Sequence, residues 1–334
     1  MKKILVTGAS GFIGSHLTER LVKLGYKVKA FFEYNSFNSK GWLDYEDKDI
    51  SGHYESVFGD VRDYQSIYNS LDNCSHIIHL AALISIPYSY KSPLSYLQTN
   101  TNGSLNIFLA AKEKKIEKII HTSTSEVYGS AKYLPIDEHH PNIGQSPYSA
   151  SKIAADRFAE SFFYSFKTPI TIIRPFNTYG PRQSLRAIIP TIILQIINSR
   201  KSIEIGSVYP KRDFLYVDDT VDAFTKLIKT NVNTNGEIIN IGTNYNISIK
   251  DLIKTILEIA NKKKIKTFTL KERKRPKASE VNNLLCNNSK AKKLLKWSPK
   301  FYGIRGLKSG LTKTYDWYVK NQDKFFFDIN KYNI

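Results

Sequence analysis

The sequence is poor in sulfur and has no long apolar run. Of 334 residues only 2 are cysteine, Cys74 and Cys286, and they form no CxxC motif. Neither a disulfide framework nor a zinc site is therefore indicated, and we predict no bound metal. His139 and His140 lie in a polar loop bounded by proline, where we expect them to be solvated. No apolar stretch approaches the roughly 18 residues of a membrane helix, and the segment MKKILVTGAS does not resemble a signal peptide, so we expect a cytoplasmic protein with no membrane partner.

Acidic residues are also few. The chain has 30 Asp and Glu against 49 Lys and Arg, which gives a net charge of +19. Such an excess would suit nucleic acid, but the lysines are spread along the chain and no nucleic-acid motif accompanies them. The densest basic run, residues 261–277, suits the phosphates of a small nucleotide as well as those of a polymer. We predict no nucleic-acid partner.

Short apolar runs alternate with longer amphipathic segments as far as Arg174. Examples are KILVTG, SHLTERLVKLG, KVKAFF and SHIIHLAA, and a long helical pattern covers residues 93–115. This alternation predicts βαβ units and therefore an α/β fold with a doubly wound parallel sheet. After Arg174 prolines break the chain, and short helical stretches alternate with polar loops. We expect the chain to divide there, into residues 1–174 and a smaller α/β region over 175–334.

A glycine-rich turn follows the first apolar run. Residues 8–14 read GASGFIG, between a predicted strand and a predicted helix. This spacing allows a tight turn, a close backbone approach to a pyrophosphate and close helix packing, as in dinucleotide sites. Glu33 lies 19 residues after Gly14, where a carboxylate would hold both ribose hydroxyls of NAD. We predict NAD as the cofactor; NADP stays open because Phe32 occupies the expected acidic position and Lys40 is the nearest cation downstream.

Tyr148 and Lys152 stand four residues apart in the segment PYSASK. On a helix they would share a face, one turn from each other. A tyrosine loses its proton near pH 10, and a nearby ammonium group together with a nicotinamide cation would lower that pKa. Alone, such a pair is usually an ordinary surface pair. Combined with the glycine turn and the hydroxyl-rich segment HTSTSEVYG, it predicts a tyrosine that acts as a general base.

These motifs stand in a familiar order along the chain. Together with GDVRD, HLAA, STSEVYG, RPFNTYGPRQ, RDFLYVDD, RPKASEV and LLKWSPK, they cover nearly all of it. The chain thus resembles the extended short-chain dehydrogenase/reductases, a family of NAD-dependent nucleotide-sugar epimerases and dehydratases. The resemblance implies a Rossmann domain that binds NAD(P) over 1–174, and a mainly substrate-binding region over 175–334 that returns segments to the Rossmann sheet.

The resemblance also implies three sets of site residues. The catalytic set is Thr124, Ser125, Glu126, Tyr148 and Lys152. The cofactor set is Gly8, Ser10, Gly11, Phe12, Ile13, Gly14, Glu33, Asp60, Val61, Leu80, Ala81, Ala82, Tyr148 and Lys152. The candidates for the diphosphate and nucleotide of a nucleoside-diphosphate sugar are Asn177, Arg182, Arg212 and Arg275. Arginine suits that task because its planar fork binds phosphate oxygens in pairs.

Glu126 distinguishes the reactions of this family. All members oxidise the sugar at C4, with Tyr148 taking the O4 proton and Thr124 holding that oxygen. An epimerase then needs no further carboxylate, whereas a dehydratase needs a base at C5 before the C6 hydroxyl leaves and hydride returns to C6, and Glu126 would be that base. Ser125 stands where the hexose dehydratases with an Asp–Glu pair have the aspartate that protonates the leaving hydroxyl. The Thr–Ser–Glu pattern resembles GDP-mannose 4,6-dehydratases instead, which implies that Glu126 carries out both proton transfers, while delivery by Ser125 stays open. The TSE triplet also occurs in UDP-glucuronate decarboxylases, which stay an alternative, as do 4-epimerases.

Two segments narrow the resemblance further. EYNSFNSKGWLD and RPKASEVNNLLCNNSKAKKLLKW look like the 4,6-dehydratases of bacterial legionaminic acid biosynthesis. That resemblance implies a UDP- or GDP-linked N-acetylglucosamine as substrate, a 4-keto-6-deoxy product, NAD regenerated in each cycle, and a role in cell-surface polysaccharide synthesis. It also implies a homodimer, for which the aromatic-rich helical patterns of residues 94–111 and 149–166 are the expected interface.

Overall fold

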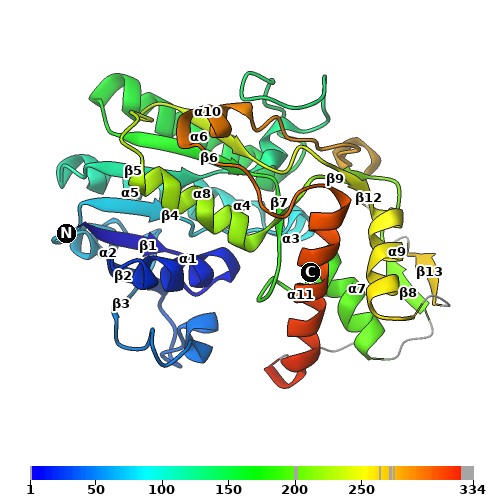
Figure 1. Cartoon of the computed structure of the whole chain (residues 1–334). Helices are drawn as coiled ribbons and strands as arrows, with labels where there is room; N and C mark the ends of the chain where they lie inside the picture. The colour runs from blue at the N-terminus through cyan, green and yellow to red at the C-terminus, as the bar shows by residue number, and fades with distance from the viewer. Residues whose placement is uncertain (1, 199–201, 263–264, 271–272, 274, 325–334) are drawn as a thin grey trace.

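The computed structural model describes residues 2–198, 202–262, 265–270, 273 and 275–324. A central sheet crosses the molecule with helices on both of its faces (Figure 1). A second group of helices and short strands lies at one end of this sheet, on the right of the view.

The central sheet contains seven parallel strands in the order β3-β2-β1-β4-β5-β6-β11. In chain order these are β1 (Lys3–Thr7), β2 (Lys27–Glu33), β3 (Tyr54–Gly59), β4 (His76–His79), β5 (Lys118–Thr122), β6 (Ile170–Pro175) and β11 (Ile238–Ile241). The order reverses between β1 and β4, and in such sheets ligands bind beyond the carboxyl ends of the strands at this point. The predicted fold class, a Rossmann-type doubly wound parallel sheet, is confirmed.

Both faces of the sheet are apolar because helices cover both of them. Successive strand residues point to opposite sides, so Ile119 packs into one hydrophobic cluster and Ile120 into the other. The covering helices are α2 (Tyr64–Ser70), α5 (Gly103–Glu113) and α6 (Pro147–Phe166) on the first face, and α1 (Phe12–Lys23) and α8 (Val217–Lys229) on the second. Two short helices, α3 (Ile86–Lys91) and α4 (Pro93–Tyr96), and a π-helical turn, η2 (Leu97–Asn102), lead into α5, so the predicted helical pattern is confirmed from Pro93 to Glu113.

The later part of the chain is less regular and shares its core with the sheet. It contains α7 (Ile188–Ile197), α9 (Ile249–Ile259), α10 (Ser289–Leu295), α11 (Gly303–Lys320) and three strand pairs, β7 (Asn177–Tyr179) with β10 (Phe214–Tyr216), β8 (Ser202–Ile205) with β13 (Lys266–Thr269), and β9 (Lys211–Arg212) with β12 (Ile247–Ser248). One hydrophobic cluster joins Val6 of the sheet to Ile192 and Leu311 of this part. The expected division after Arg174 falls inside β6, and β11 pairs with β6, so the domain boundary stays a prediction.

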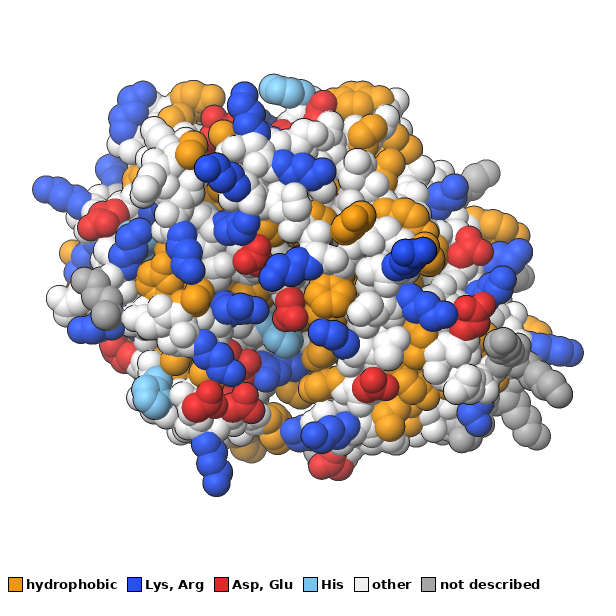
Figure 2. Space-filling model, viewed as in Figure 1, with side chains coloured by type: hydrophobic (Ala, Val, Ile, Leu, Met, Phe, Trp, Pro, Cys, Tyr) orange, Lys and Arg blue, Asp and Glu red, His pale blue; other side chains and the backbone are white. Residues whose placement is uncertain are grey.

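Several smaller expectations can be compared with the described residues. His139 is exposed as expected, but the expectation for His140 is wrong: it is buried, and its Nε2 accepts a hydrogen bond from the backbone of Lys132 at 2.8 Å. Lys and Arg are scattered over the face shown in Figure 2, with acidic and hydrophobic side chains between them. No described helix is long and apolar enough to cross a membrane. No three His, Cys, Asp or Glu side chains in the described ranges gather as metal ligands.

Candidate active site

A cavity of about 960 Å³ opens beyond the carboxyl ends of the parallel strands, where the strand order reverses. It is bounded by the glycine turn, by the segments after β3, β4 and β5, by α6, and by loops from the later part of the chain. Every residue assigned above to cofactor, catalysis or substrate lines it: Gly8, Ser10, Gly11, Phe12, Ile13, Gly14, Glu33, Asp60, Val61, Leu80, Ala81, Ala82, Thr124, Ser125, Glu126, Tyr148, Lys152, Asn177, Arg182, Arg212 and Arg275. The fold thus brings the three predicted sets together, while the role of each residue stays a proposal.

The glycine turn leaves no room for side chains. Gly8 has a φ of +71°, and a Cβ atom there would lie 2.8 Å from the backbone nitrogen of Ala81. At Gly14 a Cβ atom would lie only 2.0 Å from the carbonyl oxygen of Gly8. Helix α1 begins just after Gly11, which has no side chain to cap it, and its first turn holds no acidic residue. Backbone N–H groups at such a helix start are free to bind an anionic group, which fits the pyrophosphate of a dinucleotide.

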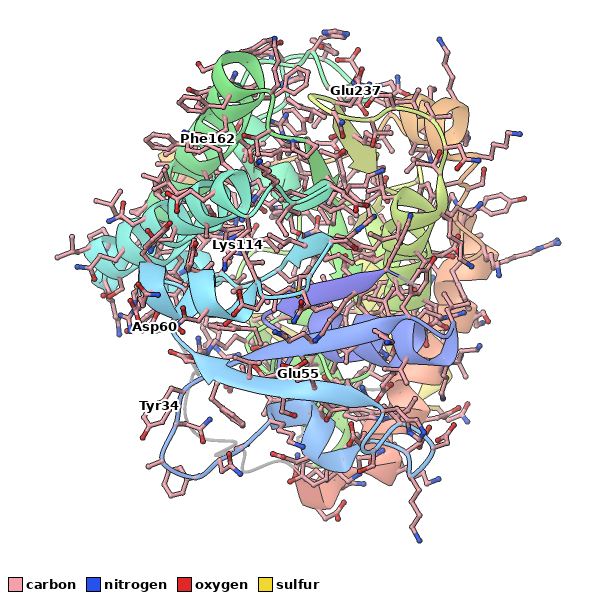
Figure 3. All side chains as sticks on the ribbon, turned by 90° about the vertical axis from the view of Figure 1, so that its left-hand side faces the viewer. Tyr34, Glu55, Asp60, Lys114, Phe162 and Glu237 are labelled. Atoms are coloured by element: carbon pink, nitrogen blue, oxygen red, sulfur yellow. The ribbon has the colours of Figure 1, made fainter. Side chains whose placement is uncertain are left out.

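Two carboxylates lie at the ends of β2 and β3. Glu33 is the last residue of β2 and is exposed, while Asp60 follows β3; Figure 3 shows Asp60 and Tyr34 at the same end of this sheet edge. The Nε of Arg62 donates to Asp60 at 2.9 Å, and this hydrogen bond lowers the pKa of Asp60. Arg62, a cation that also lines this end of the cavity, is therefore engaged by Asp60. This arrangement favours ribose hydroxyls over a 2′-phosphate.

A capping box sets the start of helix α6 and with it the position of Tyr148 and Lys152. The Ser146 side chain accepts a hydrogen bond from the backbone of Ser149 at 3.1 Å, and the Ser149 hydroxyl accepts one from the backbone of Ser146 at 3.0 Å. Pro147 occupies the first helical position. Tyr148 and Lys152 then lie one turn apart, both buried and both lining the cavity.

The electrostatics of this pair differ from the expectation in one respect. Burial raises the pKa of Tyr148, although a hydrogen bond with Thr124 lowers it. Burial also lowers the pKa of Lys152, to about 8. The Lys152 ammonium group donates to the carbonyl oxygen of Thr122 at 2.6 Å. Desolvation is therefore the largest influence on the pKa of Tyr148 in the chain without a ligand, and a bound positive charge would lower that pKa.

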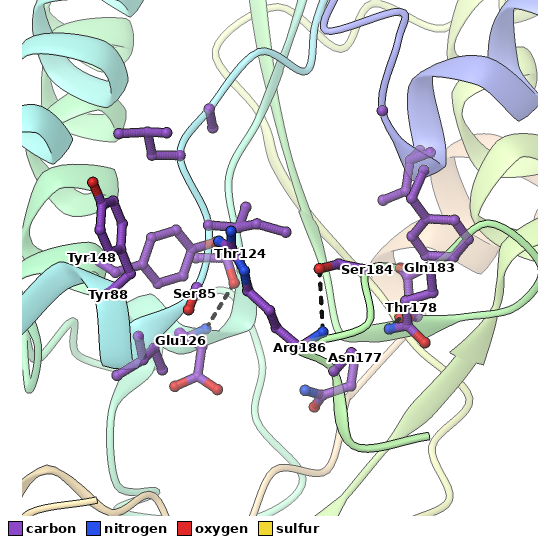
Figure 4. Close-up of a pocket in the computed structure, with 18 of the residues that line it drawn as sticks. Ser85, Tyr88, Thr124, Glu126, Tyr148, Asn177, Thr178, Gln183, Ser184 and Arg186 are labelled. Atoms are coloured by element: carbon purple, nitrogen blue, oxygen red, sulfur yellow. Dashed lines mark hydrogen bonds between the residues drawn. The ribbon is translucent and has the colours of Figure 1, made fainter. Parts of the chain in front are cut away.

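Glu126 lies in a short 3-10 helix, η3 (Ser125–Tyr128), that follows β5. The Thr124 hydroxyl caps this helix by accepting a hydrogen bond from the backbone of Glu126 at 3.2 Å. Figure 4 shows the Glu126 carboxylate beside Thr124, on the side of the cavity where Tyr148 also lies. Its side chain is 11% exposed, and it forms an ion pair with Arg275, with Nη1 at 3.9 Å from Oε2. Ser125 is more deeply buried, at 2% exposed.

Three of the predicted substrate residues carry a buried polar atom with no hydrogen-bond partner among the described residues. These atoms are Oδ1 of Asn177, Nη1 of Arg182 and Nη1 of Arg275. Buried polar groups are nearly always paired, so these atoms are available to a polar ligand in the cavity. Arg212, the fourth residue, is 6% exposed, and its Nη2 atom lies 3.5 Å from Oε1 of Glu280.

Further polar residues line the cavity although the sequence did not single them out. They include Tyr88, Gln183, Arg186 and Arg273. Tyr88 lies near Tyr148 in Figure 4. Gln183 stands in the matched segment RPFNTYGPRQ, and Arg273 lies in the basic run 261–277, part of which is outside the described residues. These two segments could have pointed to Gln183 and Arg273 as cavity residues. No such segment contains Tyr88 or Arg186, whose positions depend on the packing of loops that are far apart in the sequence.

Known proteins resemble nearly the whole chain. Residues 5–309 match the family model described as GDP-mannose 4,6 dehydratase. The dTDP-D-glucose 4,6-dehydratase of Homo sapiens is 31% identical, over 96% of this chain and 91% of its own. UDP-glucuronic acid decarboxylase 1 of Xenopus tropicalis is 30% identical, over 96% of this chain and 72% of its own. The crystal structure of UDP-glucuronic acid 4-epimerase from Bacillus cereus, in complex with UDP-glucuronic acid and NAD, is 31% identical with a TM-score of 0.85 and covers 96% of this chain and 99% of that chain.

Proposed function

Since the chain belongs to the GDP-mannose 4,6-dehydratase family, whose relatives are nucleotide-sugar dehydratases and epimerases, we propose that it is a nucleotide-sugar 4,6-dehydratase. The observation that carries the proposal is the position of Glu126. Its carboxylate lies in the same cavity as Thr124 and Tyr148, where a base for C5 of the sugar is needed.

We propose NAD as the cofactor, because the chain's own residues fit it. The backbone around Gly11 and Gly14 can receive the pyrophosphate, and Glu33 can accept hydrogen bonds from the ribose. The B. cereus epimerase, which has the same fold, was crystallised with NAD. When bound, NAD supplies the hydride acceptor for C4, the hydride donor for C6 and a positive charge that favours the Tyr148 phenolate.

Tyr148 begins the reaction as a general base. It takes the proton from O4 of the sugar, and the Thr124 hydroxyl holds that oxygen. Lys152 lies one turn further along α6 and stabilises the negative charge that forms on the tyrosine. The sugar becomes a 4-ketose, whose carbonyl group makes the C5 proton acidic.

Glu126 then carries out the elimination. Its carboxylate removes the C5 proton, the C5–H electron pair forms the C5–C6 double bond, and the C6 hydroxyl leaves as water with the proton that Glu126 returns. At the end of the cycle C5 takes up one proton and Tyr148 gives up the proton that it took from O4, so the protons balance and the net change is the loss of one water. Glu126 suits both transfers better than Ser125 because its side chain is the less buried of the two.

We propose a UDP- or GDP-linked N-acetylglucosamine as the substrate and a 4-keto-6-deoxy sugar as the product. One support is the resemblance to legionaminic acid pathway dehydratases in two segments of the sequence. The other is the pair of buried Nη1 atoms of Arg182 and Arg275 that lack a hydrogen-bond partner among the described residues and suit a diphosphate. Such a product would serve cell-surface polysaccharide synthesis, and we place the protein in the cytoplasm.

We also propose a homodimer without nucleic-acid or membrane partners. The support is a set of exposed apolar side chains on the neighbouring elements α4, η2 and α6, namely Leu94, Leu97, Phe158, Tyr164 and Phe166. A monomer rarely leaves such a set uncovered. Sedimentation equilibrium measures the mass directly, and a mass of one chain would contradict the dimer.

Two other reactions are compatible with the family and serve as rival outcomes. The B. cereus protein with the same fold is a 4-epimerase, and the X. tropicalis relative is a decarboxylase. A 4-epimerase has no step in which Glu126 would act as a C5 base. A decarboxylase needs a uronic acid as substrate.

Mass spectrometry separates the three reactions. We expect incubation with UDP- or GDP-N-acetylglucosamine to yield a nucleotide sugar that has lost one water. In Glu126→Gln we expect the rate of water loss to fall by about 10²–10⁴-fold, because a carboxamide cannot accept the C5 proton, with NAD binding intact. A product of unchanged mass would indicate epimerisation, loss of carbon dioxide from a UDP-uronic acid would indicate decarboxylation, and full turnover by Glu126→Gln would refute the assignment.

A further inference from the structure

A buried carboxylate, Asp156, lies one helical turn beyond Lys152 on α6. Tyr148, Lys152 and Asp156 follow one another at intervals of four residues and therefore lie along one side of the helix. The exposed fraction is 0% for Asp156 and 3% for Lys152. A buried charge is costly unless its surroundings compensate for it, and the proposed reaction does not use Asp156.

Two neighbours donate hydrogen bonds to the Asp156 carboxylate, and a third lies close to it. Ser123 donates to its Oδ2 at 2.8 Å, and Arg174 donates to the same oxygen from Nη2 at 2.8 Å and from Nε at 3.1 Å. His121 Nε2 lies 3.4 Å from Oδ1. Burial tends to raise the pKa of this carboxyl group, but Arg174 and His121 lower it to about 2. Asp156 therefore stays negatively charged at every pH at which the enzyme would work.

Lys152 depends on that negative charge. Burial lowers the pKa of Lys152 to about 8, and the charge of Asp156 is the influence that raises it. The hydrogen bond of the Lys152 ammonium group goes to a neutral acceptor, the carbonyl oxygen of Thr122. Because this pKa lies close to neutral pH, a small shift in it strongly changes the protonated fraction of Lys152. A buried charge can cause such a shift, since charges interact more strongly in a protein interior than in water.

We propose that Asp156 is a positioning residue that keeps Lys152 protonated beneath the cavity. This proposal rests on the proposed function, in which Tyr148 and Lys152 act as a pair. The carboxylate supplies negative charge one turn away. Its bonds to Arg174 and Ser123 hold it below the cavity floor, so it neither enters the cavity nor takes a proton from substrate.

The histidines around the pair do not replace this charge. His79 and His121 stack with ring centroids 5.6 Å apart, and burial lowers the pKa of both. Both rings are therefore neutral at neutral pH. Tyr148, whose pKa burial raises, is a neutral phenol in the free chain.

The other charged groups near Lys152 determine whether its pKa rises or falls when Asp156 is replaced. Burial raises the pKa of Glu160, and this residue pairs with Arg157 at 2.6 Å. Arg174 keeps its positive charge. Replacing Asp156 by a neutral residue would thus remove an attraction on the Lys152 ammonium group and leave Arg174 as an unbalanced cation, and both changes lower the pKa of Lys152.

The test is a pH titration of Lys152 by NMR in the full chain with ¹³C-labelled lysine, in which Lys152→Arg identifies the signal. In Asp156→Asn we expect the pH at which Lys152 is half deprotonated to fall by about one unit or more. The same half-point in Asp156→Asn and in the unmodified chain would overturn the proposal.

Two control variants separate charge from structure. Ser123→Ala removes a hydrogen bond to Asp156 without changing any charge, and we expect no shift. Asp156→Glu keeps the charge, and we expect the half-point to return to that of the unmodified chain.

If Asp156→Asn does not fold, the double variant Asp156→Asn with Arg174→Met removes both buried charges and should fold. We still expect a downward shift there, because Asp156, and not Arg174, is the charge that acts on the pKa of Lys152, and an unshifted half-point in that variant would overturn the proposal.

The titration needs no turnover and therefore distinguishes this proposal from the proposed function. If water elimination occurs, its alkaline limb should move to lower pH in Asp156→Asn by the same amount as the Lys152 half-point. A merely structural role would lower the rate without moving that limb. If no nucleotide sugar loses water but the Lys152 shift is found, the dehydratase assignment fails and the role of Asp156 stands.

Discussion

The two sides of the cavity are built in different ways. We call residues 8–14 and 80–82, together with Glu33, the cofactor side, and Asn177, Arg182, Arg212 and Arg275 the sugar side. The cofactor side is mostly backbone, with glycines at the points of closest approach. The sugar side consists of long polar side chains from several separate segments.

This difference explains what each side recognises and how it tolerates change. A backbone surface binds a pyrophosphate through N–H groups that only a substitution by proline removes, but any added atom obstructs it. A side-chain surface can be altered residue by residue, and each arginine contributes a separate charged contact. Substitutions of the glycines on the cofactor side should therefore affect folding and NAD together, whereas substitutions on the sugar side should affect the substrate alone.

The largest expected effect comes from crowding the cofactor side with Gly14→Ala. The new Cβ atom would lie 2.0 Å from the Gly8 carbonyl oxygen, and backbone on both sides leaves little room to yield. We expect a loss of about 3 kcal/mol in the free energy of unfolding. Urea denaturation and NAD titration check this prediction, and we expect NAD affinity to fall with stability.

Gly25→Ala is the matched control. Gly25 has a φ of +80°, a conformation that favours glycine, but no atom lies within 4 Å of the Cβ position. Its cost should be limited to backbone strain, about 1 kcal/mol, with NAD affinity unchanged. Equal losses in the two variants would show that close approach at Gly14 does not matter.

On the sugar side, Arg275→Gln should weaken substrate binding and leave the cofactor in place. The Nη1 atom of Arg275 is buried without a hydrogen-bond partner among the described residues, so a diphosphate would gain a charged contact there. We expect KM for the nucleotide sugar to rise about 100-fold, or about 2.7 kcal/mol, with NAD affinity unchanged. Arg305→Gln, on the exposed surface of α11 outside the cavity, makes the same charge change and should have no effect. A parallel loss of NAD affinity in Arg275→Gln would contradict the separation of the two sides.

The same contrast explains what the sequence could predict. The glycine turn and the pair Tyr148 and Lys152 are contiguous motifs whose spacing carries their geometry, so their positions could be predicted from the sequence alone. Tyr88 and Arg186 could not, because their places depend on how loops far apart in the sequence pack together. The burial of His140 was missed for the same reason.

Electrostatics were predicted least well. Spacing indicated that Lys152 lies near Tyr148, but it could not show that desolvation lowers the pKa of Lys152 to about 8. Burial depends on the whole fold, and no local pattern reports it. No local pattern reports the burial of the two carboxylates behind the cavity, Asp156 and Asp213, although Asp213 stands in the matched segment RDFLYVDD.

We expect the contributions of Asp156 and Asp213 to stability to depend on pH in opposite directions. Asp213 follows Arg212 of the sugar side and accepts hydrogen bonds from Thr243, Asn244 and Cys286. Burial nevertheless raises its pKa to about 6. Because the pKa is higher in the folded than in the unfolded chain, its contribution to stability is fully present below about pH 4 and is lost as the pH rises through 6. Asp156, with a pKa lowered to about 2, has the opposite dependence: its contribution is present above about pH 4 and is lost as the pH falls through 2.

Asp213→Asn should remove the first of these dependences. We expect the difference in unfolding free energy between Asp213→Asn and the unmodified chain to change by about 2 kcal/mol between pH 4 and pH 6, in favour of the variant at the higher pH. Denaturant unfolding at a series of pH values measures it, and Cys286→Ala, a nearby buried change without a carboxyl group, should give a difference that is constant over that range. A constant difference for Asp213→Asn as well would show that its hydrogen bonds, rather than burial, determine its charge.

The smallest expected effect comes from Glu33→Gln, a change of side chain on the side that is mostly backbone. Glu33 is exposed at the end of β2, so its charge is screened by solvent. We expect the preference for NAD over NADP, measured as a ratio of dissociation constants, to fall by about fivefold, or about 1 kcal/mol. Glu55→Gln, on β3 and outside the cavity, should leave the ratio unchanged. An effect as large as the one expected for Arg275→Gln would mean that the cofactor side also relies on a single charged side chain, and the contrast between the two sides would then be lost.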